Sequence, residues 1–154
     1  DADALNALAK EPNILKLTDV PIILTPHPGE MARLTGLEID EINANRIRIT
    51  QEMAQQWGVI IVLKGSRTVI ADPEGNVYVN TTGNAGMATA GAGDVLTGII
   101  SSLIAQGVAP MNAAVAGVFL HGLAGDLAAR EKGERGLIAG DIIHYLPSVL
   151  KEFE

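Results

Sequence analysis

The chain has 154 residues, of which 18 are acidic and 11 are basic, so its formal net charge is −7 at neutral pH. Because nucleic acids are held by clustered lysine and arginine side chains, this balance argues against a nucleic-acid partner. The acidic composition suits a cytoplasmic protein, and the absence of cysteine excludes a disulfide scaffold and a cysteine nucleophile. The longest aliphatic run, Val59 to Leu63, is far shorter than the roughly 20 residues of a membrane span. The length predicts a single domain over residues 1–154.

Short β-branched runs alternate with helical ones in the first half of the chain, as in an α/β domain. Val20 to Thr25 predicts a buried strand, and Glu30 to Thr35 predicts a short helix closed by Gly36. From Asp40 to Trp57 the apolar residues keep a helical period, which predicts one longer helix. The run from Val59 to Leu63 predicts the second strand.

Two short strands and three helices are predicted in the rest of the chain. Thr68 to Ala71 and Val77 to Val79 flank the turn residues Asp72 to Asn76, which is typical of a β-hairpin. Helical periods then follow over residues 95–106, 110–129 and 141–150. Pro147 is expected to kink or divide the last helix.

Five glycines fall within the sixteen residues from Gly83 to Gly98. Small residues let the backbone approach a ligand closely, and a helix that begins at Gly91 points free amides and the positive end of its dipole at an anion. Asp94 follows at once. In phosphoryl transfer, such amides stabilise the moving phosphoryl group while a carboxylate orients or deprotonates the attacking hydroxyl. The alternative is that Asp94 only caps the helix.

Two further polar segments follow the two predicted strands directly. They are Thr25 to Glu30 and Lys64 to Thr68. Because ligands of open α/β sheets bind beyond the carboxyl ends of the strands, these segments and the glycine-rich segment are expected to converge on one pocket. His27 is a candidate hydrogen-bond partner of a ligand, or else an exposed loop residue. Lys64 is a candidate phosphate contact, or else a solvated lysine. His121 and Asp126 are interpreted as packing and capping residues of a helix.

With these motifs the chain resembles the C-terminal larger part of ADP/ATP-dependent NAD(P)H-hydrate dehydratases, which are ribokinase-like proteins. The most specific segments are Gly83 to Thr89 and Gly91 to Gly98. The supporting segments are Asp1 to Leu5, Leu24 to Glu30, Val62 to Gly65 and His121 to Asp126. The resemblance implies a three-layer α/β/α fold with a mostly parallel central sheet, from which the N-terminal part of the family domain is absent.

The resemblance also implies a reaction. ADP or ATP, accompanied by Mg²⁺, phosphorylates the hydroxyl of hydrated NADH or NADPH, and elimination of phosphate restores the nicotinamide, which makes the enzyme a lyase. Asp94 would act as the catalytic base and contact the hydrate. The resemblance implies that the nucleotide is bound by Lys64, Gly65, Ser66, Arg67, Thr68, Asn84, Gly86, Met87, Ala88, Thr89, Gly91, Ala92 and Gly93. It implies that the hydrate is bound by His27, Pro28, Gly29, Glu30 and Arg33 together with Asp94. It identifies no metal ligand.

Two other functions remain open at this point. One is a ribokinase-like kinase of a small alcohol such as a vitamin precursor, and the other is a non-catalytic nucleotide-binding protein. Two positions also depart from the family pattern: Ala90 stands where glycine is usual, and Ala85 stands where proline is common. A non-glycine at a strained dihedral angle at position 90 would shift the anion site.

The part of the family domain that precedes Asp1 is expected to be missing from this chain, which begins without methionine. Without it, a sheet edge and some apolar surface would be uncovered, and such surface usually finds a partner. We therefore expect that the chain is a fragment, forms a homo-oligomer or needs a complementing N-terminal segment.

Overall fold

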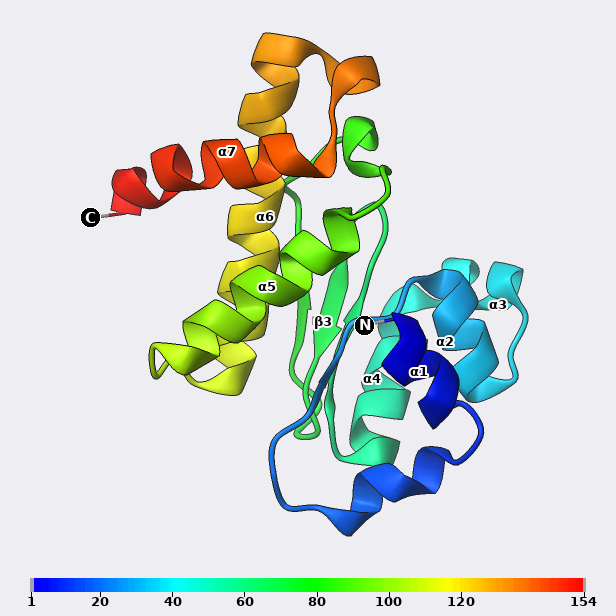
Figure 1. Cartoon of the computed structure of the whole chain (residues 1–154). Helices are drawn as coiled ribbons and strands as arrows, with labels where there is room; N and C mark the ends of the chain where they lie inside the picture. Colours follow the sequence, from blue (N-terminus) through cyan, green and yellow to red (C-terminus); the bar gives the residue numbers. More distant parts are fainter. Residues whose placement is uncertain (1, 154) are drawn as a thin grey trace. The chain divides into compact units, whose positions relative to one another are not determined.

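The computed structural model describes residues 2–153, so Asp1 and Glu154 lie outside the described residues. The chain divides into two compact units, Asp1–Val79 and Asn80–Glu154, which we call the N-terminal unit and the C-terminal unit (Figure 1).

The N-terminal unit is an α/β structure built on a four-stranded sheet. Its elements are α1 (Ala2–Leu8), the 3₁₀ helix η1 (Pro12–Leu17), β1 (Ile23–Leu24), α2 (Pro28–Thr35), α3 (Ile39–Ala44), α4 (Arg46–Trp57), β2 (Ile60–Leu63), β3 (Val69–Ala71) and β4 (Val77–Val79). The strand order is β1-β2-β3-β4, with β1 and β2 parallel and the other two pairings antiparallel. Among residues 2–153 the sheet is therefore mixed, and the mostly parallel sheet that the resemblance implies is represented only by the β1–β2 pair.

The predicted hairpin is confirmed, with Val69 opposite Val79 and Ala71 opposite Val77. The carboxylate of Asp72 closes its turn, because Oδ1 accepts from the backbone N–H of Asn76 at 2.8 Å and Oδ2 accepts from its Nδ2 at 2.7 Å. An Asp or Asn side chain that bonds backbone a few residues on is typical of such turns.

Three sequence expectations for this unit differ from the structure. The strand predicted from Val20 is shorter, since β1 spans Ile23–Leu24. The helix predicted from Asp40 to Trp57 is two helices, because Asn45 leaves the helical region at φ −129° and ψ 35°. The helices α1 and η1 had not been predicted. An unbroken apolar period does not reveal a single non-helical residue, which explains the error at Asn45.

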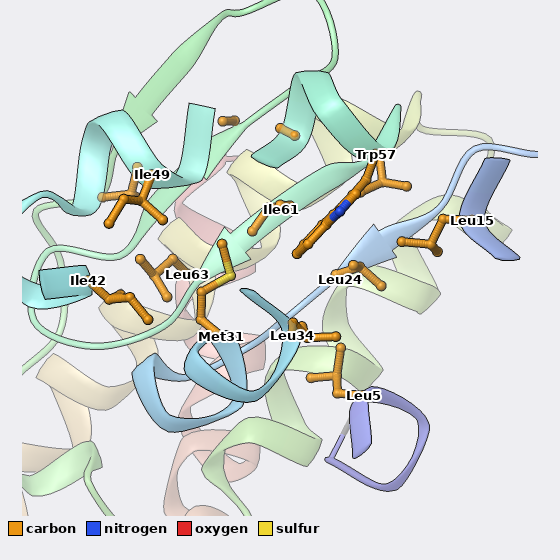
Figure 2. Packing of buried hydrophobic residues seen from close by; sticks show 14 residues of the cluster. Leu5, Leu15, Leu24, Met31, Leu34, Ile42, Ile49, Trp57, Ile61 and Leu63 are labelled. Atoms are coloured by element: carbon orange, nitrogen blue, oxygen red, sulfur yellow. The ribbon is translucent and has the colours of Figure 1, made fainter. Parts of the chain in front are cut away.

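One hydrophobic cluster holds the N-terminal unit together. Its largest fully buried members are Met31 of α2, Ile42 of α3, Ile49 of α4, and Ile61 and Leu63 of β2. Figure 2 shows these side chains, with those of Leu5, Leu15, Leu24, Leu34 and Trp57, gathered in a common interior. This packing fixes the ends of β1 and β2, after which two of the predicted site segments follow.

The C-terminal unit is helical within the described residues. Its elements are η2 (Ala85–Met87), α5 (Ala92–Ala105), α6 (Pro110–Lys132), η3 (Glu134–Gly136), α7 (Ala139–Leu150) and η4 (Lys151–Phe153). Helix α6 packs against both α5 and α7, and their cluster includes Ala92, Leu120 and Ile142. Helix α7 continues through Pro147 and is not divided there.

By length and composition alone, α6 is long and apolar enough to cross a membrane. Its longest aliphatic runs are short because Gly117, His121 and Asp126 interrupt them. Half of its most apolar window is buried within the structure.

Candidate functional site

The first turn of α5 presents an exposed carboxylate beside backbone amides. Gly91 is the N-cap in the left-handed region, at φ 87° and ψ −13°, and Ala92, Gly93 and Asp94 are the first three helical residues. The N–H of Ala92 donates to the carbonyl of Thr89 at 3.3 Å. The amides of Gly93 and Asp94 have no carbonyl acceptor within the helix, as is usual in a first turn, and such amides can bind an anion. Asp94 is exposed, and α5 has no side-chain cap hydrogen bond within the described chain. Whether Asp94 is a catalytic base or only compensates the helix dipole therefore stays a prediction.

Neither alanine that departs from the family pattern strains the backbone. Among residues 2–153, Arg67 is the only non-glycine residue with a positive φ, so Ala90 has an ordinary conformation. The left-handed conformation belongs to the next residue, Gly91. Ala85 starts the 3₁₀ helix η2. The expected shift of the anion site by Ala90 is therefore not supported.

The loop that leads into η2 is fixed by side chains and by close packing. The Oδ1 atom of Asn84 accepts from the N–H of Gly86 at 3.0 Å and caps η2. A Cβ atom at Gly86 would lie 2.5 Å from the carbonyl oxygen of Glu134, so only glycine fits there. The carboxylate of Asp126 on α6 accepts hydrogen bonds from this loop, and the imidazole of His121, also on α6, contacts the carbonyl of Ala92 at the start of α5.

In the N-terminal unit, His27 and Glu30 form a capping box at the start of α2. His27 Nδ1 accepts from the N–H of Gly29 at 3.0 Å, and Glu30 Oε2 accepts from the N–H of His27 at 2.7 Å. Since Nδ1 accepts, it carries no proton in this arrangement. This capping role accounts for the presence of both residues without a ligand. Half of the His27 side chain is exposed, so it could also contact a ligand.

Lys64 comes close to this capping box. Its Nζ lies 3.7 Å from Oε2 of Glu30, whose side chain is only 3% exposed, and its backbone N–H donates to the carbonyl of Pro26 at 2.8 Å. The ends of β1 and β2 are thus tied together. The two segments that follow these strands therefore lie next to each other in the N-terminal unit.

Arg46, which the sequence reasoning did not single out, supports the segment from Lys64 to Thr68. Its Nη2 donates to the carbonyls of Leu63 at 2.8 Å and Lys64 at 3.1 Å, and burial lowers its pKa. The segment itself is tightly turned, with φ 134° at Gly65 and φ 54° at Arg67. No sequence signal could have found Arg46, because an arginine that begins a helix is usually solvated.

Arg33 contacts α1, since its Nε donates to Oδ1 of Asn6 at 2.9 Å. Its predicted contact with the hydrate stays a prediction, as do the other substrate and nucleotide contacts. The structure brings His27, Glu30 and Lys64 together in one unit, and it holds the loop at Asn84 and the start of α5 on α6 in the other. That the two groups meet in a single pocket also stays a prediction. Within residues 2–153, no three His, Asp or Glu side chains are grouped so that they could hold a metal ion.

The chain was compared with known protein families, sequences and structures. A family model described as NAD(P)H-hydrate dehydratase matches residues 1–148. The bifunctional NAD(P)H-hydrate repair enzyme Nnr of Moorella thermoacetica is 54% identical over 154 residues, which are 100% of this chain and 29% of that protein. A crystal structure of ADP/ATP-dependent NAD(P)H-hydrate dehydratase from Bacillus subtilis, co-crystallised with ATP and Mg²⁺, is 42% identical over 87% of this chain and 48% of that chain, with a TM-score of 0.85.

A ribokinase-like superfamily protein of Enterococcus faecalis has a TM-score of 0.81 at 31% identity and covers 98% of this chain and 51% of that chain. The ribokinase-like fold expected from the sequence is thus confirmed. The chain spans between about a third and a half of the length of these relatives. A match over nearly the whole chain establishes that the chain belongs to the family of NAD(P)H-hydrate dehydratases.

Proposed function

We propose that this chain takes part in the ADP- or ATP-dependent dehydration of hydrated NADH or NADPH. The observation that carries the proposal is the first turn of α5, where the exposed Asp94 carboxylate stands directly beside backbone amides of Gly93 and its own residue. Membership of the dehydratase family supports the substrate class. The Bacillus subtilis relative, co-crystallised with ATP and Mg²⁺, supports a nucleotide as the phosphoryl donor.

The proposed reaction has two steps. Asp94 accepts the proton of the hydroxyl group on the hydrated ring while the oxygen of that group attacks the terminal phosphorus of the nucleotide. The leaving group is AMP when the donor is ADP, and ADP when the donor is ATP. The first-turn amides stabilise the charge on the transferring phosphoryl oxygens. Inorganic phosphate then leaves the ring carbon, a proton leaves the neighbouring carbon, and the double bond forms between them.

The donor set of the chain fits a nucleotide with Mg²⁺. This ion is usually held by substrate phosphates, water and one or two carboxylates, so a cage made of protein ligands is not required. The described residues offer no such cage, and they offer amides where phosphates would lie. When bound, Mg²⁺ neutralises phosphate charge, while the chain's amides orient the phosphoryl group and Asp94 handles the proton.

We test the reaction by incubating NADH hydrate with the protein, Mg²⁺ and either ADP or ATP. Recovery of NADH absorbance together with release of phosphate is expected. A stable phosphorylated alcohol from a small vitamin-like alcohol, with no NADH recovery, would instead indicate a kinase. Binding of ADP in a thermal-shift experiment without turnover of any substrate would indicate a non-catalytic nucleotide-binding protein.

We also propose that the active species contains a second chain, either another copy or a complementing segment. Strand β1 pairs on one side only among residues 2–153, and it has only two residues. The segment that leads to it carries apolar side chains on the surface, since Ile14 is 54%, Leu17 is 83% and Val20 is 69% exposed. An unpaired strand edge beside exposed apolar groups is typical of surface that takes a partner.

A further inference from the structure

Asp126 of α6 is bonded entirely to the loop that precedes η2. Its Oδ2 accepts from the backbone N–H of Gly83 at 2.9 Å, and its Oδ1 accepts from Nδ2 of Asn84 at 3.0 Å. The two partners are 43 and 42 residues earlier in the chain. Both oxygens of one half-buried carboxylate are therefore used to hold one loop against the middle of a long helix.

Asn84 links Asp126 to η2, because it hydrogen-bonds to both Asp126 and Gly86. A carboxylate can only accept hydrogen bonds, so the amide of Asn84 must turn its Nδ2 to Asp126. Its Oδ1 then faces Gly86, from whose N–H it accepts at 3.0 Å. The backbone N–H groups of Gly83 and Gly86 can only donate, so one orientation of the Asn84 amide satisfies all three hydrogen bonds.

The surface of α6 is shaped to receive this loop. A Cβ atom at Gly125 would lie 2.3 Å from Sδ of Met87, and one at Gly122 would lie 2.0 Å from Oγ1 of Thr82. These glycines let the loop approach the helix more closely than any other residue would allow. Close packing of this kind transmits small displacements of the helix to the loop.

The same stretch of α6 also holds the start of α5. His121 Nε2 lies 3.0 Å from the carbonyl oxygen of Ala92, the first residue of α5. Burial of the imidazole lowers its pKa, so the neutral ring donates its Nε2 proton to that carbonyl. Residues 121–126 of α6 therefore hold both the loop at Asn84 and the turn that bears Asp94.

We propose that Asp126 is a positioning residue for nucleotide binding: through Asn84 it sets the loop from Gly83 to Met87 relative to the first turn of α5. This inference rests on the proposed function, since it takes that loop and that turn to bind the phosphates. Asp126 itself touches neither nucleotide nor hydrate. A phosphate site depends on the placement of its amides to within fractions of an ångström, so a loosened loop weakens binding.

The test exchanges the two side chains. In D126N the amide at position 126 has one acceptor oxygen, so it cannot accept from both the N–H of Gly83 and Nδ2 of Asn84. In N84D the carboxylates at positions 84 and 126 face each other and repel. In the double variant D126N/N84D, the new carboxylate at position 84 accepts from both the new amide and Gly86, so all three hydrogen bonds are restored. The matched control is Y145F, which removes a hydrogen bond between α6 and α7, to Glu131, away from the loop.

The dissociation constant of ADP with Mg²⁺ is measured by isothermal titration, and Tm by calorimetry. We expect each single variant to bind on the order of tenfold more weakly, the double variant to recover most of that loss, and Y145F to bind like the parent. Parental affinity in D126N with a lower Tm would overturn the proposal, because Asp126 would then be merely structural. A double variant that binds no better than N84D, which carries the same carboxylate at position 84, would overturn it too.

Measuring ADP binding and dehydration of the hydrate separately distinguishes a failure of the positioning role from a failure of the proposed function. ADP binding that follows the expected pattern, without dehydration of the hydrate, would contradict the proposed function alone. A parent protein that binds neither ADP nor ATP would overturn both. If D126N does not fold, the comparison of the double variant with N84D carries the test: tighter ADP binding in the double variant supports the proposal, and equal or weaker binding contradicts it.

Discussion

Gly91 sets the direction of the first turn of α5 through a left-handed backbone conformation, with φ 87°. Any other L-residue would be strained there, and a Cβ atom would lie 3.2 Å from Cβ of Ala139. We expect G91A to lower the free energy of unfolding by about 1–2 kcal/mol and to weaken ADP binding. Chemical denaturation and isothermal titration measure the two effects.

The neighbouring position supplies the control for that prediction. Ala90 has no positive φ, so A90G relieves no backbone strain. We expect it to lower the free energy of unfolding by less than about 1 kcal/mol, because glycine gives the unfolded chain more conformational freedom. ADP affinity is expected to stay at the parental level in A90G. If A90G bound ADP more tightly than the parent, alanine at this position would impair the anion site after all.

At the scale of elements, the contact of α6 with α5 includes the buried imidazole of His121, whose Nε2 lies 3.0 Å from the carbonyl oxygen of Ala92. Burial lowers the pKa of this imidazole below its ordinary value of 6.5. Between the lowered pKa and 6.5, the unfolded chain therefore binds a proton that the folded chain does not, so the free energy of unfolding rises with pH across that window. We expect Tm to fall between pH 7.5 and pH 5, and H121Q to reduce that fall. An equal fall in H121Q and the parent would contradict this account.

The sequence predicted most elements because their signals are local. Gly36 closes α2 in the left-handed region, and the turn residues at Asp72 and Asn76 make the hairpin. Local patterns could not show the break at Asn45, where no glycine or proline interrupts an apolar period. Of the candidate site, Asp94 and the glycines stand out by spacing. The contacts of Arg46 and Asp126 follow instead from hydrogen bonds to residues far away in the sequence, which no local pattern shows.

At the scale of the whole molecule, the single-sided pairing of β1 and the exposed Leu17 predict association. We expect size-exclusion chromatography with light scattering to give a mass above 16.1 kDa, or a complex with a complementing segment. L17E, which places a charge on the exposed surface, is expected to weaken that association, with E52Q on exposed α4 surface as the control. An active monomer of 16.1 kDa would contradict the proposal.

We propose that Asp94 is the base of a phosphoryl transfer at the start of α5. The most direct measurement is the rate of NADH recovery from its hydrate, with Mg²⁺ and nucleotide, by the parent, D94N and E41Q. Glu41 is a matched control because it is the third residue of α3 and exposed, as Asp94 is in α5. We predict that D94N loses on the order of 10²–10⁴ in rate while E41Q keeps the parental rate. A D94N variant as fast as E41Q would contradict the account.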